Sequence, residues 1–171
     1  DYELFEQGVV ERPVVCNDHI HTFMEHNVPD LWTYYCCCQV EDVANRFIAM
    51  PSYRNRILGW QLYKYNIRGF LHWGFAFWDS ELYSLDPAAR FKGDGFIVYP
   101  DAENQEVLHS NRGLATTQGA EEYELLCIAA ERFPEEAKAL ATRLTRCFTD
   151  FDDDPELLEK LRVELFTLCE L

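Results

Sequence analysis

The hydrophobic and polar positions along residues 31–77 follow two different patterns. Residues 31–38 and 67–77 are almost continuously apolar, which is typical of strands that are covered on both faces. The stretch between them, residues 41–65, carries apolar side chains at helical spacing, and Pro51 is expected to break or kink that helix. A strand, a helix and a strand in this order predict a parallel β/α unit.

Another strand is predicted ahead of this unit. Residues 9–16 are mostly apolar, and Pro13 stands near the start of the segment, where a missing backbone donor does least harm. We therefore expect three parallel strands, near residues 12–17, 31–38 and 68–77.

The second half of the chain is predicted to be mostly helical. Apolar residues recur at helical spacing in three segments, residues 119–132, 135–148 and 156–169. Residues 79–92 and 102–111 have no such period and are expected to be loops, with a short strand over 96–99 between them.

The net charge of −15 excludes some classes of partner. Phosphate backbones and anionic membrane surfaces both select clustered Lys and Arg, so we expect neither a nucleic-acid nor a membrane partner. No apolar run of about 18 residues and no signal peptide is visible, and a cytoplasmic location is expected. Because the sequence starts at Asp1 without an initiator Met, we expect a fragment or a single domain.

The seven cysteines are an odd number, and three of them, Cys36, Cys37 and Cys38, are consecutive. Adjacent strand residues point to opposite faces, and neither a disulfide framework nor zinc-ligand spacing is visible. The aspartate run 150–154 lacks the spacing of a calcium loop and is better explained as helix caps. We expect no disulfide, no bound metal and no cofactor.

Aromatic residues are crowded at the predicted strand ends. All four tryptophans lie between Leu31 and Tyr99, and Trp73 and Trp78 lie near the carboxyl end of the last strand. Ligands of parallel β/α folds bind at that edge of the sheet. Rings there can stack on the C–H faces of a sugar, although ordinary core packing explains aromatic residues equally well.

Polar residues at the same edge are candidates for binding sugar hydroxyls. Asn17, Asp18 and His19 follow the first strand, and Gln39 follows the second. Asp18 is alternatively a helix N-cap, and His72, inside the third predicted strand, is alternatively a core histidine. No nucleophile elbow, phosphate loop or dinucleotide-binding motif is present.

Three pairs of segments, agreeing in order and spacing, resemble the C-terminal part of the catalytic domain of glycoside hydrolase family 123 and related domains of unknown function. They are NDHI at 17–20 with DLWTYYCC at 30–37, NRFIAMP at 45–51 with RNRILGWQLYKY at 54–65, and GFLHWG at 69–74 with GDGFIVYP at 93–100. Residues 112–126 are similar to a family helix that ends in Glu-Asp-Tyr-Glu, which here reads EEYE at 121–124. The resemblance covers about residues 1–126.

The resemblance implies a fold and a chemistry. The fold is α/β, the C-terminal portion of a (β/α)8 barrel with about three parallel strands. Residues 1–111 would form the partial barrel, and residues 112–171 would form helices packing on it. Characterised members resemble β-N-acetylgalactosaminidases, in which the substrate's own acetamido group attacks the anomeric carbon, assisted by an adjacent Asp-Glu pair.

This chain departs from the family pattern at two points: no Asp is directly followed by a Glu, and the region between Trp78 and Gly93 is shorter than the family pattern leads us to expect. The resemblance therefore implies a sugar-binding wall without the catalytic pair, formed by Asp18, Tyr34, Tyr35, Trp73 and Trp78. An amino-sugar glycoside is the expected ligand, and the missing barrel portion or a second copy of the chain is the expected partner. A non-catalytic carbohydrate-binding remnant and a structural or interaction domain remain alternatives.

Overall fold

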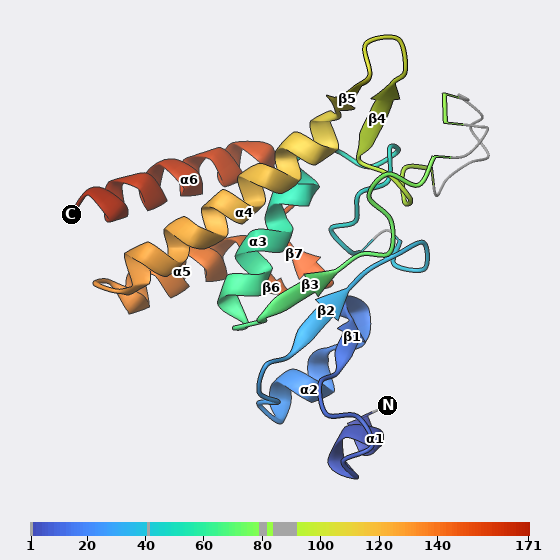
Figure 1. The fold of residues 1–171 in the computed structure, drawn as a ribbon. Helices are drawn as coiled ribbons and strands as arrows, with labels where there is room; N and C mark the ends of the chain where they lie inside the picture. Colours follow the sequence, from blue (N-terminus) through green and yellow to red (C-terminus); the bar gives the residue numbers. More distant parts are fainter. Residues whose placement is uncertain (1, 41, 79–81, 84–91) are drawn as a thin grey trace.

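The computed structural model describes residues 2–40, 42–78, 82–83 and 92–171, which form a mixed α/β fold (Figure 1). Its first half contains α1 (Tyr2–Glu6), β1 (Val14–Cys16), a 3-10 turn (Asn17–His19), α2 (His21–Glu25), β2 (Trp32–Tyr34), α3 (Arg54–Lys64) and β3 (Gly69–Leu71). Its second half contains β4 (Val98–Asp101), β5 (Glu106–His109), α4 (Asn111–Ala130), α5 (Pro134–Leu144), β6 (Thr145–Cys147), β7 (Asp150–Phe151) and α6 (Pro155–Glu170).

The three predicted strands form one parallel sheet in the order β1-β2-β3. Cys16 pairs with Tyr34, and Tyr34 pairs with Leu71, so the three strands end side by side. The prediction of parallel pairing is confirmed. Each strand is only three residues long, however, and the prediction that the third strand extends to residue 77 is wrong.

The long helix predicted over residues 41–65 is also shorter in the structure. Only α3, Arg54–Lys64, is helical, and residues 42–53 form turns and irregular chain. Pro51 disfavours a helical conformation of the residue before it. The side chain of Asn45 donates hydrogen bonds to the carbonyls of Cys36 and Gln39, both at 2.7 Å, which fixes this irregular segment against the end of β2.

Two hairpins replace parts of the predicted loops and helices. β4 and β5 pair antiparallel, although residues 102–111 are so polar that they predict a loop. Helix α4 then begins at Asn111, eight residues before its predicted start, because the Ser110 side chain accepts a hydrogen bond from the Gly113 amide and caps it. Helix α5 ends at Leu144, where the chain turns extended and forms β6, so the predicted helical end at 148 is wrong.

Helix α3 lies between the sheet and a layer formed by α4, α5 and α6 (Figure 1). Ile57 and Trp60 face the helical layer and belong to its apolar core with Leu126, Leu144 and Leu161. Leu58, one residue along, instead belongs to a second core under the sheet with residues such as Ile20, Leu31, Tyr35 and Phe148. The C-terminal helices therefore hold the sheet in place through α3.

The backbones of α3 and α4 touch where two glycines meet. A Cβ atom added to Gly59 would lie 1.9 Å from the carbonyl oxygen of Gly119, and one added to Gly119 would lie 2.9 Å from Arg56. The helices can approach this closely only because both positions lack a side chain.

A buried carboxylate joins three helices beside this crossing. Glu122 of α4 is almost fully buried and accepts hydrogen bonds from Arg56 Nε at 3.1 Å and from Trp60 Nε1 at 2.7 Å. Arg162 of α6 lies 3.4 Å from the same carboxylate, and Arg56 also pairs with Glu159. Burial of Glu122 is tolerated because it is paired and hydrogen-bonded.

Among the residues described, no helix combines the length and the apolar composition that crossing a membrane requires.

Candidate carbohydrate site at the carboxyl edge of the sheet

The parallel register brings three strand ends to one edge of the sheet. Asn17 and Asp18 follow β1, residues 35–39 follow β2, and His72 and Trp73 follow β3. This is the edge at which parallel β/α folds bind ligands.

Asp18 is partly exposed at this edge and is fixed by three donors. Its carboxylate accepts hydrogen bonds from Cys16 Sγ at 2.7 Å and from Gln39 Nε2 at 3.3 Å, and His19 Nδ1 lies 2.7 Å away. Partial burial raises the pKa of Asp18, but the hydrogen bonds of Cys16, His19 and Gln39 outweigh it, so that the net pKa is below its usual value. Asp18 is therefore ionised at neutral pH and suited to accept hydrogen bonds from hydroxyl or amide groups.

Gln39 and Asn45 connect the ends of β1 and β2. The Gln39 side-chain oxygen accepts from the Cys36 amide at 2.9 Å, while its nitrogen donates to Asp18. Asn45 bonds the carbonyls on both sides of the same turn, and its oxygen accepts from the Arg46 amide at 2.6 Å. Both side chains are buried, so the turn after β2 is fixed from inside.

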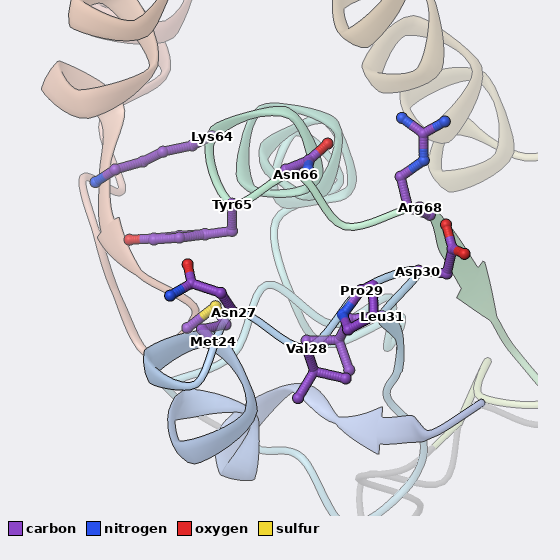
Figure 2. A pocket seen from close by; sticks show the side chains of 10 residues that line it. All are labelled: Met24, Asn27, Val28, Pro29, Asp30, Leu31, Lys64, Tyr65, Asn66 and Arg68. Carbon is purple, nitrogen blue, oxygen red and sulfur yellow. The ribbon is translucent and has the colours of Figure 1, made fainter. Parts of the chain in front are cut away.

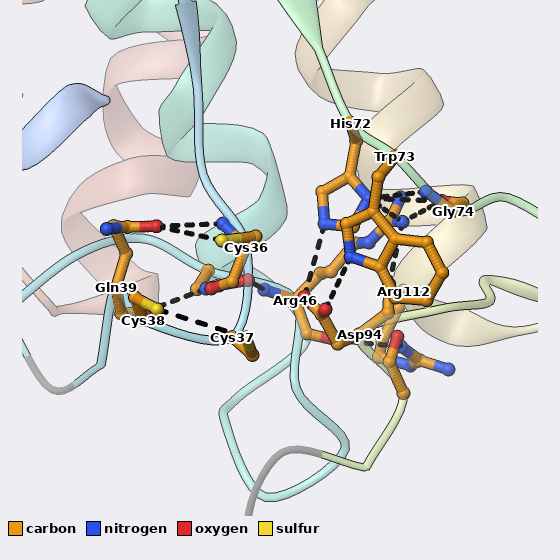
Figure 3. A network of polar contacts seen from close by, with 12 residues as sticks. Cys36, Cys37, Cys38, Gln39, Arg46, His72, Trp73, Gly74, Asp94 and Arg112 are labelled. Atoms are coloured by element: carbon orange, nitrogen blue, oxygen red, sulfur yellow. Dashed lines mark hydrogen bonds and ion pairs between the residues drawn. The ribbon is translucent and has the colours of Figure 1, made fainter. Parts of the chain in front are cut away.

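Arg46 extends the connection to the end of β3 (Figure 3). Its buried guanidinium donates to the carbonyl of Asp94 at 2.9 Å and also contacts His72 and the carbonyl of Gly74. Burial lowers the pKa of Arg46 to about 10, which still leaves the group charged at neutral pH. Its own carbonyl accepts from Arg112 at 2.7 Å.

Trp73 ends this series of contacts. Its Nε1 donates to Asp94 Oδ2 at 2.6 Å, and the other Asp94 oxygen lies 3.3 Å from His72 Nε2 (Figure 3). The side chain nevertheless stays 54% exposed. An indole that is held by its N–H group and open at its ring is preorganised for stacking on a ligand.

The backbone beneath Trp73 is equally constrained. Phe77 donates its amide to the Gly95 carbonyl at 3.0 Å, and Ile97 donates to Phe75 at 3.0 Å. The Phe77 ring packs edge-on against Trp73 with centroids 5.3 Å apart, and a Cβ added to Gly95 would lie 3.0 Å from the Trp73 ring. Phe75 and Phe77 are themselves mostly exposed, so a row of rings faces solvent here.

The predicted wall residues occupy different environments. Trp78 is 39% exposed and donates Nε1 to the Val98 carbonyl at 2.9 Å. Tyr34 is half-buried, and its pKa is raised by burial and, to a smaller extent, by the neighbouring Cys16. Tyr35 is only 2% exposed and packs on Phe70 and His72, so its ring offers no stacking surface in this structure.

The residues that fix the site are ones that sequence reasoning did not single out. Arg46, Arg112 and Asp94 are buried polar residues. The two arginines donate to backbone carbonyls, that of Asp94 among them. Sequence patterns show side chains but not where carbonyls converge. The one available signal was Asp94 between Gly93 and Gly95, because a carboxylate in a tight glycine turn is commonly a fixed acceptor.

The cysteine prediction needs a correction. All seven cysteines are free thiols. Cys36, Cys37 and Cys38, however, lie in a turn rather than in a strand, and their three sulfur atoms lie within 4.8 Å of one another instead of on opposite faces. Cys16, Asp18 and His19 form a second such group of potential ligand atoms.

A cleft of about 610 Å³ lies at the opposite, amino-terminal side of β2 (Figure 2). Asp30 and Leu31, just before β2, line it together with Lys64, Tyr65 and Arg68. Lys64 donates a hydrogen bond to the carbonyl of Thr145, and the Tyr65 hydroxyl donates one to the carbonyl of Arg146. None of the exposed rings described above lines this cleft, and we assign the candidate site to the carboxyl edge.

Comparison with known proteins agrees with the resemblance seen in the sequence. Residues 1–129 match the family model described as glycoside hydrolase 123, catalytic domain. A search of curated proteins finds no match.

A solved structure is similar in fold, that of a family 123 glycoside hydrolase from Clostridium perfringens, described in work on glycolipid glycan hydrolysis. It is 14% identical in sequence, with a TM-score of 0.60. The match covers 99% of this chain but only 32% of that protein, so the chain spans about a third of its structural relative. The family match extends over most of the chain, and the protein therefore belongs to glycoside hydrolase family 123.

Proposed function

We propose that the carboxyl edge of this sheet is the sugar-binding wall of a glycoside hydrolase whose ligand is an amino-sugar glycoside, a β-N-acetylhexosaminide. Trp73 is the main stacking surface and Trp78 a second ring. Asp18 accepts hydrogen bonds from the hydroxyl or acetamido groups of the sugar. Tyr34 lies beside Asp18 at the end of β2, and the buried Tyr35 supports the wall from beneath.

One observation carries the proposal: a continuous series of polar contacts links Asp18 to the exposed indole of Trp73. It passes through Gln39, the turn after β2, Asn45, Arg46 and Asp94. Hydrogen bonds between buried groups hold the groups at the ends of such a network in place. A protein that needed these aromatic rings only for its core would not hold one of them open to solvent by a buried carboxylate.

Asn17 also favours a ligand or partner at this edge. Its side chain is 1% exposed, and neither of its polar atoms has a hydrogen-bond partner among the residues described. An unpaired buried amide costs about 1–3 kcal/mol. A sugar hydroxyl or a further part of the barrel would satisfy it.

Catalysis in the substrate-assisted manner needs a carboxylic acid to protonate the leaving oxygen and a carboxylate to orient the acetamido group. The ionised Asp18 cannot act as that acid, and nowhere in the sequence is an Asp directly followed by a Glu. We infer that a barrel portion outside these residues contributes the pair, with a second copy of the chain as the less direct alternative. The (β/α)8 architecture is part of this proposal.

Binding can be tested by tryptophan fluorescence during titration with methyl N-acetyl-β-galactosaminide. The indoles of Trp73 and Trp78 are exposed and Trp60 is fully buried, so a bound sugar should change the emission through Trp73 and Trp78, and Trp78 still reports binding in Trp73→Ala. Loss of one stacked ring is worth about 1 kcal/mol, so Trp73→Ala should weaken binding about fivefold or more.

Trp32→Phe is the matched control, because Trp32 is 41% exposed but lies at the other end of β2. It should leave the affinity unchanged. Saturable binding with unchanged affinity in Trp73→Ala would refute the assignment of the wall. The absence of any sugar response, with both variants folded, would favour the structural or interaction domain.

A further inference from the structure

The turn after β2 gathers three thiols at the protein surface. Cys37 and Cys38 are exposed, Cys36 is half-buried, and the Sγ atoms of Cys37 and Cys38 lie 4.0 Å apart (Figure 3). All three sulfur atoms fall within 4.8 Å of one another. Consecutive residues of a regular strand could not achieve this, because their side chains alternate between faces.

These separations fit the coordination of one metal ion. With zinc–sulfur bonds of about 2.3 Å, two thiolates on the same ion lie about 3.8 Å apart in a tetrahedron and about 4.0 Å apart in a trigonal plane. The Cys37–Cys38 distance already has this value, and the third sulfur needs to move by less than about 1 Å.

The fold, rather than a ligand, holds the turn in this shape. Asn45, which is fully buried, donates to the carbonyls of Cys36 and Gln39, and Gln39 accepts from the Cys36 amide. The backbone on both sides of Cys37 and Cys38 is therefore fixed by side chains from the protein interior. A preorganised set of ligands loses little conformational entropy when it binds.

We propose that Cys36, Cys37 and Cys38 form a surface binding site for a thiophilic d10 cation of the zinc class, coordinated by three thiolates with its remaining position open to solvent. Three sulfur ligands select a soft ion over Mg²⁺ or Ca²⁺, which prefer oxygen. The site is separate from the ring surface of Trp73 and does not depend on the proposed sugar binding.

The test is metal binding by the full 171-residue chain, kept reduced by a phosphine that does not bind metal. Zn²⁺ affinity is measured by competition with a chromophoric chelator, and Co²⁺ is used as a spectroscopic substitute whose sulfur-to-metal charge-transfer absorption reports thiolate ligands. We expect one ion per chain. Cys37→Ser and Cys38→Ser should each weaken Zn²⁺ binding at least about 100-fold, since even the partners that only orient a ligand are worth 10–100-fold.

Two matched variants separate this site from other thiols. Cys169→Ser, in α6, removes a half-buried cysteine far along the chain and should leave the affinity unchanged. His19→Ala removes a ligand of the Cys16, Asp18 and His19 group and should also leave it unchanged. Loss of binding in His19→Ala with retention in Cys37→Ser and Cys38→Ser would overturn the proposal. So would the absence of charge-transfer absorption with folded, reduced protein.

Discussion

Replacement of Glu122 by glutamine should destabilise the whole helical layer. Glu122 accepts from Arg56 Nε at 3.1 Å and Trp60 Nε1 at 2.7 Å, and Arg162 lies 3.4 Å away. Glutamine keeps the shape but loses the charge, and its amide group turns a donor toward at least one of these donors. Among the residues that the structure describes, Arg56, itself buried, would then retain only the exposed carboxylate of Glu159 as a charged partner.

The magnitude follows from this burial. Removing one partner of a buried ion pair typically costs about 3–5 kcal/mol, because the remaining charge is left uncompensated. This is a large fraction of the about 5–15 kcal/mol that stabilises a domain. At this chain length about 1 kcal/mol corresponds to about 2–4 °C, so the melting temperature should fall by about 6–20 °C.

Urea unfolding followed by circular dichroism measures the loss. Glu121→Gln is the matched control, because it makes the same chemical change one residue away on an exposed position. It should change the free energy of unfolding by no more than about 0.5 kcal/mol. If Glu122→Gln costs less than about 1 kcal/mol, the buried network does not hold the helices together as described.

Three further predictions concern the helix crossing, pH and activity. Gly59→Ala should lower the free energy of unfolding in urea by about 1–3 kcal/mol or more, because its methyl group would lie 1.9 Å from the Gly119 carbonyl oxygen. An unchanged free energy of unfolding would contradict the close backbone contact. The Asp153 carboxylate accepts hydrogen bonds from Arg54 Nε at 3.0 Å and from the Tyr53 hydroxyl at 2.9 Å. The bond from Arg54 lowers the pKa of Asp153 and outweighs burial, which raises it. The stabilisation that Asp153 gives the folded state is therefore fully present above the unfolded-state pKa of about 4, and it is lost as the pH falls through the lower pKa of the native state. Asp153→Asn should cost under about 1 kcal/mol at neutral pH, with the difference from the parent shrinking below about pH 4; a constant difference would contradict the ion pair. Finally, the chain alone should not hydrolyse an aryl β-N-acetylhexosaminide, since it lacks the Asp-Glu pair; turnover abolished by a point change within these residues would overturn this.

Hydrophobic patterning predicted the parallel sheet but not the lengths of its strands. Residues 72–77 are as apolar as a buried strand, yet the side chains of Trp73, Phe75 and Phe77 are exposed on loops. The apolar residues of this segment form an exposed aromatic surface instead of a buried strand, and hydrophobic periodicity cannot distinguish the two. The β4–β5 hairpin was missed for the opposite reason, because β5 is exposed along its whole length and reads as polar loop.

The candidate site was predictable in its location and in its family but not in its internal support. Strand ends and aromatic crowding indicated Asp18 and Trp73, which the structure places on one connected edge. Arg46 and Arg112 act on carbonyls of loops far along the chain, a type of contact that leaves no residue pattern. The thiol cluster was hidden by the assumption of a regular strand through Cys38.

The most direct test of the sugar-binding wall is the set of four indole N–H signals in a ¹H–¹⁵N NMR spectrum, recorded while methyl N-acetyl-β-galactosaminide is added. Each tryptophan has a distinct setting: Trp73 bonds Asp94, Trp78 bonds the Val98 carbonyl, Trp60 bonds Glu122, and Trp32 lies at the opposite end of the sheet. Sugar binding at this edge should produce saturable shifts of the Trp73 and Trp78 signals and leave those of Trp32 and Trp60 unchanged. Shifts confined to Trp32, or no shift of Trp73 at saturating sugar, would contradict it.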